Sequence, residues 1–157
     1  MKLLGAIYDS PVKLLEKAER DGAALTQALS NCDESAVHDS LFNFAITAYH
    51  LVDWVKTLRP EVDISKVSDL LEGSECLRAC RDLCNASKHI DLTKYPPTAQ
   101  DVRFSATAAT SISNTSASQP PWRLKIQMKD GHTIRADDLV SDVIDAWKTF
   151  FADNHIQ

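Results

Sequence analysis

The chain has 157 residues, 44% of them hydrophobic and 25% charged, which is the composition of a soluble globular domain and excludes a disordered chain. Its net charge of −5 excludes a general attraction to nucleic acid, so any contact with RNA requires a local basic face. The apolar run before Asp9 is too short for a signal-peptide core or a membrane span, and we expect a cytoplasmic protein without membrane contact.

Two helices are predicted in the first part of the chain. Ser10 and Pro11 form an N-cap signal, and apolar residues recur at helical spacing from there to about Ser30. Asp33 opens a second helix, which Pro60 ends. This second helix carries a broad apolar stripe of Leu41, Phe44, Ala45, Ala48, Leu51, Val52, Val55 and Leu58.

A third helical stretch is predicted from about Ser65 to Ile90. The pair Gly73-Ser74 is the place where this stretch would break. Two consecutive prolines at 96–97 end it, because the residue before a proline is driven out of the helical conformation.

The character of the sequence changes after these prolines. The stretches VRFSATAATSIS and PWRLKIQMKDGHTIRA are rich in β-branched residues or alternate between apolar and polar residues, as strands do. Asp130-Gly131 predicts a type I′ hairpin turn within the second stretch. A final helix is expected to open at Asp137-Asp138, with an apolar face that includes Trp147.

The predicted fold is therefore α+β and mostly helical, a bundle of about four helices with a small three-stranded antiparallel sheet before the last helix. We expect a single domain over residues 1–157, with a helical part at 1–95, the sheet at 100–136 and the C-terminal helix at 137–155. The sequence contains no internal repeat, glycine-rich phosphate loop or paired metal-ligand signature.

Three cysteines, Cys76, Cys80 and Cys84, lie four residues apart in the third helical stretch. On a helical wheel they share one arc with leucines, which indicates the core side of the helix. Buried free cysteine behaves as a small hydrophobic residue, and a zinc site would need a fourth ligand and paired close spacings that the sequence lacks. We therefore expect packed, reduced thiols and neither a metal ion nor a cofactor.

The opposite arc of the same helix carries Arg78, Arg81, Asn85 and His89, with Asp82 beside them. Such a row is often only a solvated helix face. It is also what is needed to hold a phosphate diester, because guanidinium grips phosphate bidentately and imidazole moves a proton near neutral pH. Both interpretations remain open from the residues alone.

The second helix carries polar and aromatic side chains on the flank away from its apolar stripe, namely Asn43, His50, Trp54 and Thr57. A lone histidine in such a position is more often structural than catalytic. If the second and third helical stretches pack antiparallel, His50 and Asp53 would approach Arg81 and line one groove with it.

The combination of YHLVDWV in one helix and CRDLCNASKH in the next resembles the HEPN superfamily, the higher eukaryotes and prokaryotes nucleotide-binding domains, and in particular its small bacterial and phage-associated members. The resemblance covers residues 33–90 well and the remainder loosely. It implies a compact helical bundle, a homodimer and, in active members, metal-independent RNA cleavage by an arginine and a histidine of one helix.

Carried over residue by residue, the resemblance makes Arg81 the motif arginine, Asp82 its polar neighbour and His89 the histidine. Arg81 would bind and stabilise the scissile phosphate, and His89 would act as general acid or base. Seven residues lie between Arg81 and His89, slightly more than is usual in the motif, whereas Lys88 fits the spacing but lacks the imidazole.

Two functions follow from the resemblance. The first is a metal-independent endoribonuclease in a toxin–antitoxin or phage-defence setting. The second is a catalytically inactive HEPN-like module that binds a protein partner or a nucleotide through the same face. In either case the binding residues around the pair are Arg78, Asn85, Lys88, His50 and Asp53.

Overall fold

The computed structural model describes residues 7–86, 97–105 and 123–157. Its elements are, in chain order, α1 (Pro11–Ser30), α2 (Glu34–Leu58), α3 (Ile64–Gly73), α4 (Glu75–Ala86), β1 (Ala99–Ser105), β2 (Arg123–Met128), β3 (Thr133–Arg135) and α5 (Ala136–Asp153). The predicted α+β class, mostly helical with a small three-stranded antiparallel sheet before the last helix, is confirmed. Among these residues no helix combines the length and the apolar character that crossing a membrane requires.

Side-chain caps start four of the helices, at Ser10, Asp33, Asp63 and Ser74, where the sequence offers a short polar residue. The Ser10 hydroxyl accepts a hydrogen bond from the backbone N–H of Lys13 at 3.4 Å, with Pro11 at the first helical position. The Asp33 carboxylate accepts from the Ala36 N–H at 3.0 Å in the same way at the start of α2. These local signals explain why the predicted starts of the first two helices match the structure.

The third helical stretch is two helices, which raises the number described from the expected four or so to five. The break falls at Ser74, whose backbone is extended (φ −107°, ψ 112°). Its N–H donates to the Leu70 carbonyl at the end of α3, and its hydroxyl accepts from the Leu77 N–H in the first turn of α4. One residue therefore ends α3 and caps α4. The part of this stretch that was expected beyond Ala86 lies outside the described residues.

The sheet is antiparallel with the order β1-β2-β3. Ile126 sits at its centre, opposite Val102 of β1 and Ile134 of β3. A hairpin turn joins β2 to β3 as predicted, but it is not of type I′, because Asp130 lacks the positive φ that a type I′ turn requires. The Gly131 N–H donates to the Met128 carbonyl at 3.1 Å, so Lys129 and Asp130 form the centre of the turn and Gly131 follows it with a φ of 99°. The predicted alternation is also present, because Leu124, Ile126 and Met128 are buried while the residues between them are partly exposed.

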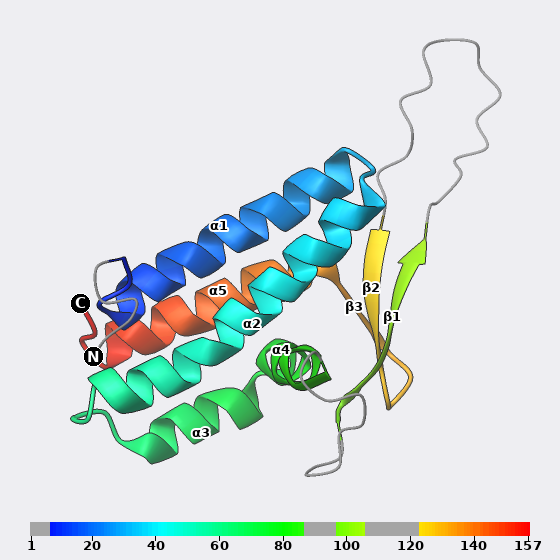
Figure 1. Cartoon of the computed structure of the whole chain (residues 1–157). Helices are drawn as coiled ribbons and strands as arrows, with labels where there is room; N and C mark the ends of the chain where they lie inside the picture. Colours follow the sequence, from blue (N-terminus) through cyan, green and yellow to red (C-terminus); the bar gives the residue numbers. More distant parts are fainter. Residues whose placement is uncertain (1–6, 87–96, 106–122) are drawn as a thin grey trace, which may run out of the picture.

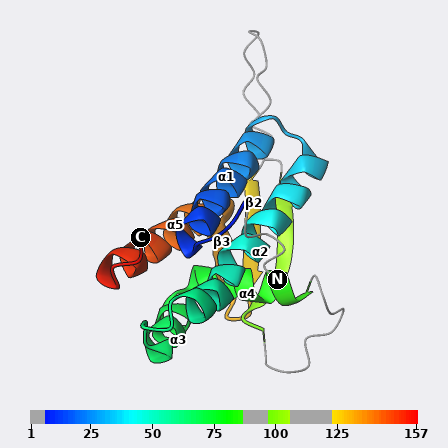
Figure 2. The same ribbon diagram turned by 60° about the vertical axis from the view of Figure 1, so that its left-hand side comes forward.

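Three long helices form one side of the molecule and the sheet lies at the other. Figure 1 shows α1, α2 and α5 running beside one another, with α4 seen almost end-on below α2 and next to β1. Figure 2 shows the same layers from a second direction, with α3 and the C-terminal turns of α5 on one side. Helix α4 therefore links the bundle to the sheet, since it contacts α2, α5 and β1.

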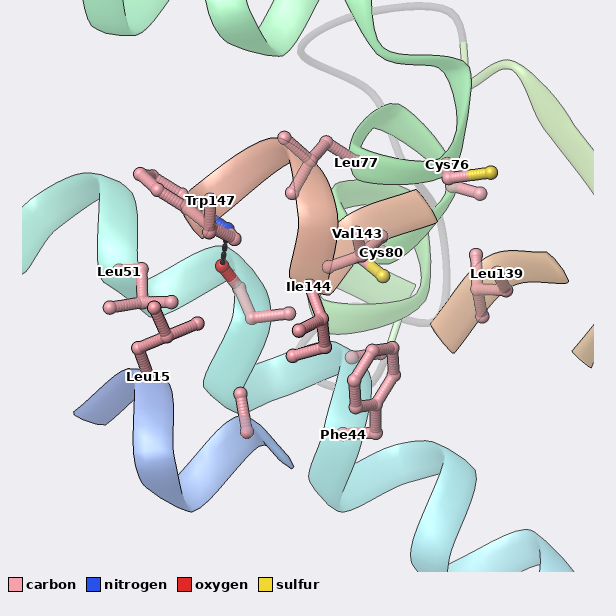
Figure 3. Close-up of a cluster of buried hydrophobic side chains, with 14 of the residues drawn as sticks. Leu15, Phe44, Leu51, Cys76, Leu77, Cys80, Leu139, Val143, Ile144 and Trp147 are labelled. Atoms are coloured by element: carbon pink, nitrogen blue, oxygen red, sulfur yellow. Dashed lines mark hydrogen bonds between the residues drawn. The ribbon is translucent and has the colours of Figure 1, made fainter. Parts of the chain in front are cut away.

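The core is centred on Trp147 of α5, which is fully buried. Its indole N–H donates to the Ala48 carbonyl of α2 at 3.1 Å, so the ring's one polar atom is satisfied (Figure 3). Phe150 and Phe151 meet the indole edge-on, with ring centroids 5.8 Å and 5.9 Å away. This arrangement joins α2 and α5 through both apolar packing and a buried hydrogen bond.

The cysteine prediction is confirmed for packing, because Cys76, Cys80 and Cys84 are all buried and free. Cys80 packs in the same core as Leu77 and Val143 (Figure 3). Burial, assisted by the nearby Asp142 carboxylate, raises the pKa of the Cys76 thiol to about 12. A thiol with such a pKa stays protonated near neutral pH and is a poor nucleophile and metal ligand.

Helices α1 and α5 lie close together at Gly22. A Cβ atom at this position would lie 2.6 Å from Val140 Cγ1 and 3.4 Å from Phe44 Cε2. The absent side chain thus lets α1 lie directly against α5 and α2. Although glycine is a poor helix former, its place inside α1 is explained by this contact.

Gly22→Ala is expected to lower the free energy of unfolding, because overpacking between helices costs about 1–3 kcal/mol and outweighs the roughly 1 kcal/mol that alanine gains in a helix. Urea denaturation measures the change. Gly73→Ala is the matched control: no atom lies within 4 Å of its Cβ position, so it should be neutral or stabilising. A Gly22→Ala protein as stable as the wild type would contradict this account of the contact.

Candidate functional site

Arg81 of α4, the predicted motif arginine, is held by two carboxylates. Its Nε lies 3.2 Å from Asp82 Oδ1, and its Nη1 lies 3.6 Å from Glu72 Oε1. Only 13% of the Arg81 side chain is exposed. The row that the helical wheel predicted as an open polar face is therefore largely closed at this position.

Asp82 is a buried carboxylate, with 2% of its side chain exposed. Its Oδ2 accepts three hydrogen bonds where the chain enters β1: from the Thr98 N–H at 2.5 Å, from the Thr98 hydroxyl at 2.8 Å and from the Ala99 N–H at 3.0 Å. The charge is compensated by these donors together with Arg81. Asp82 is thus a structural anchor between α4 and β1, a role that the sequence did not indicate.

The remaining residues of the predicted row are placed only in part. Arg78 and Asn85 are partly exposed, and the Arg78 guanidinium donates to the Glu72 carbonyl at the end of α3. Lys88 and His89 lie outside the described residues. The pairing of Arg81 with His89 therefore remains a prediction.

His50 of α2 meets α4 at Cys84. Its Nε2 lies 3.9 Å from the Cys84 sulfur. The two helices do not run antiparallel as the sequence analysis had supposed, since Figure 1 shows α4 almost along its axis while α2 lies across the view. Asp53, one turn further along α2, is exposed.

His50 also lines a small pocket of about 210 Å³, which we call the His50 pocket. Asn43, His50 and Trp54, which share the polar and aromatic flank of α2, form part of its wall, and residues from the α1 side complete it. The lining residues are Tyr8, Leu14, Lys17, Asn43, Ile46, Thr47, His50 and Trp54. The pocket therefore combines two aromatic rings, an amide, an imidazole and an ammonium group.

The ammonium of Lys17 is already paired. Its Nζ lies 2.5 Å from Asp21 Oδ2 and 2.9 Å from the Thr47 hydroxyl, which in turn donates to Asp21 at 2.7 Å. This network joins α1 to α2 and compensates the lysine charge. The His50 pocket is consequently polar and aromatic but not strongly cationic. Tyr8 and Lys17 were missed from the sequence because they reach the pocket only through the packing of α1 on α2.

The described part of the chain contains one group of side chains with the donor set of a metal site, Glu75, Asp130 and His132. His132 Nδ1 lies 2.5 Å from Asp130 Oδ1, and its Nε2 lies 3.0 Å from Glu75 Oε2. Both ring nitrogens thus face carboxylates, which a protonated imidazole satisfies without a metal. The hydrogen bond to Asp130, followed by the one to Glu75, raises the pKa of His132 above its ordinary value of 6.5.

Asp82→Ala is expected to destabilise the fold more than Arg81→Ala. The first change leaves the Thr98 and Ala99 N–H groups without their acceptor, which costs roughly 1–3 kcal/mol for each buried group left unsatisfied. The second removes one charged partner of a carboxylate that keeps three donors, which costs about 1.5–3 kcal/mol in total. Thermal and urea unfolding measure both. Arg20→Ala on the exposed side of α1 is the control and should change little. An unchanged stability for Asp82→Ala would refute the anchor.

The His132 bridge predicts a pH-dependent contribution to stability. Because the folded pKa of His132 is raised, its contribution is fully present below the unfolded value of 6.5 and is lost as the pH rises through the folded value. His132→Gln should therefore lose more stability at about pH 5.5 than at about pH 8.5. His38→Gln is the control, because His38 is an exposed histidine that lies 3.9 Å from Glu34 and outside the bridge. An equal loss at both pH values would argue against the bridge.

Comparison of the chain with protein-family models, curated proteins and solved structures finds no match in any of the three. The assignment to the HEPN superfamily therefore stays a proposal that rests on the two sequence stretches in α2 and around α4. What the chain does has to be inferred from the chemistry of its own residues.

Proposed function

We propose that the chain is a catalytically inactive HEPN-like module that binds a nucleotide in the His50 pocket. The proposal rests on the difference between the position of Arg81 and the positions of the polar and aromatic residues around His50. Arg81 is engaged by the fold, whereas Asn43, His50 and Trp54 line a hollow that a small ligand can enter. A homodimer and a phage-defence or toxin–antitoxin setting belong to the same proposal through the resemblance alone.

The state of Arg81 supports inactivity. To stabilise the charge that develops on a scissile phosphate, a guanidinium must direct free N–H groups toward it in a preorganised site. Arg81 instead faces Asp82 and Glu72, and it is mostly covered. Binding a phosphate there would first require breaking ion pairs, one of which holds the anchor of β1.

The size and chemistry of the His50 pocket support a nucleotide base as the ligand. Its volume of about 210 Å³ is smaller than the roughly 300–1,000 Å³ of pockets that enclose drug-sized molecules, so a single ring system fits it best. Tyr8 and Trp54 supply aromatic surface, on which a base gains about 1–3 kcal/mol by stacking. Asn43 and His50 supply hydrogen-bond donors and acceptors for the edge of the base.

An endoribonuclease is the second candidate, and one observation favours it. Arg78, Arg81 and Asn85 share α4, and His50 reaches the same helix at Cys84. Two guanidinium groups, an amide and an imidazole are thus gathered around one helix. In this alternative Arg81 would be released from its carboxylates on RNA binding, and His89 would move the proton.

Binding is tested with the 5′-monophosphates of the four RNA nucleosides, followed by tryptophan fluorescence and thermal shift of the full chain. We expect at least one nucleotide to bind and to raise the melting temperature. Asn43→Trp should abolish binding, because the exposed Asn43 lines the pocket and a large ring would fill it. Asp39→Trp, at an exposed position of the same helix, is the control and should bind as the wild type does. No binding of any nucleotide would refute this ligand class.

Cleavage is tested with a single-stranded RNA of mixed sequence in the presence of a chelator. The proposal expects no cleavage above background. Cleavage that is lost in both Arg81→Ala and His89→Ala, with nucleotide binding retained, would select the endoribonuclease instead. Light scattering of the same preparation measures whether the chain forms the predicted dimer.

A further inference from the structure

A groove runs between α3 and α5 on a part of the molecule that neither function uses. It has a volume of about 580 Å³, and it shares no lining residue with the His50 pocket. Figure 2 shows α3 and the C-terminal turns of α5, which form its two walls, on the same side of the molecule. We call it the α3–α5 groove.

The floor of the α3–α5 groove is apolar. It consists of Leu70 from α3 and of Ala146 and Phe150 from α5. The two aliphatic residues are partly exposed, while Phe150 is buried and held edge-on against Trp147. The floor is therefore built on the packed core and presents apolar surface that a partner can cover.

The rim of the groove is acidic. Asp69, Asp145 and Asp153 line it and are all exposed. Within the ranges that the structure describes, none of these three carboxylates makes an ion pair. The single cation of the rim, Lys66, donates to the Asn154 side chain at 2.9 Å across the two helices. Glu19, with which Lys148 forms its ion pair, raises the pKa of that lysine, and Asp145 contributes to the same shift. With three carboxylates and one cation in its lining, the groove keeps an excess of negative charge beside an apolar floor.

We propose that the α3–α5 groove binds a short, basic amphipathic helix of a partner protein. An aliphatic side chain of that helix would cover the floor, while lysine or arginine residues beside it would meet the three aspartates. Charge complementarity selects this occupant, because RNA and acidic segments would be repelled. The acidic net charge of the chain itself also disfavours a second copy as the occupant.

A fluorescently labelled model peptide of leucine and lysine, patterned as an amphipathic helix, tests the proposal by anisotropy with the full chain. We expect it to bind more weakly as the salt concentration rises, because exposed charges are screened. The same peptide with glutamate in place of lysine should not bind. Equal binding of the two peptides, or binding of neither, would overturn the proposal.

Two sets of variants then assign the binding to this groove. The triple change Asp69→Asn, Asp145→Asn and Asp153→Asn should weaken binding about tenfold, as expected from three exposed charge pairs. Glu16→Gln, Glu34→Gln and Asp39→Asn change the net charge equally at exposed sites elsewhere and should leave the affinity within about twofold. If the three control substitutions weaken binding as much as the three groove substitutions do, the peptide is held by general charge attraction and the proposal is wrong.

Thr149→Trp tests the shape of the groove independently of charge. Thr149 is exposed and lines the groove, so a tryptophan there should block the peptide without altering the melting temperature. Unchanged peptide binding would refute the site. Light scattering tests whether a second copy of the chain occupies the groove instead. If Thr149→Trp turns a dimer into a monomer, the groove is an interface between copies of this chain and the proposal is wrong.

Discussion

The arrangement of the helical bundle and the sheet depends on the hydrogen bonds that the Asp82 carboxylate accepts. A charge that is almost completely buried is tolerated only when donors surround it. Here three of the donors come from Thr98, just before β1, and from Ala99, its first residue. The position of β1 against α4 is therefore fixed by electrostatics. Because β2 pairs with β1 and β3 pairs with β2, this contact helps to place the whole sheet, which α5 also contacts through β2 and β3.

The same interaction determines how α4 can be used. One face of α4 places its cysteines in the core, where burial keeps the thiol of Cys76 protonated. The other face offers Asp82 to β1 and turns Arg81 toward Asp82 and Glu72. Both faces of the helix thus serve the fold along most of its described length. For this reason we interpret α4, whose polar row resembles a catalytic face in the sequence, as the helix that connects the bundle to the sheet.

The two proposed binding surfaces lie elsewhere on the molecule, and they differ in character. The His50 pocket collects aromatic and neutral hydrogen-bonding groups, with its one lysine neutralised by Asp21. The α3–α5 groove collects unpaired carboxylates above an apolar floor. A base with its polar edge suits the first, and a basic helix suits the second. The proposed nucleotide and the proposed protein partner therefore do not compete for the same residues.

The sequence by itself determined the features that depend on neighbours in the chain. Caps at Ser10 and Asp33, the turn at Gly131 and the helical spacing of the cysteines act over a few residues, so their outcome could be predicted. The α+β class followed from the same periodicities. The third helical stretch is two helices, because Ser74 both ends α3 and caps α4. The pair Gly73-Ser74 marks this place in the sequence only as a weak break signal.

Only the tertiary structure decided which polar residues are used by the fold. The donors to Asp82 come from residues 98–99, and no helical wheel of α4 contains them. Tyr8 and Lys17 join the His50 pocket through the packing of α1 on α2, and the α3–α5 groove unites residues about eighty positions apart. Periodicity assigns a residue to a face of its own element, whereas burial and charge compensation depend on what the rest of the chain places against that face.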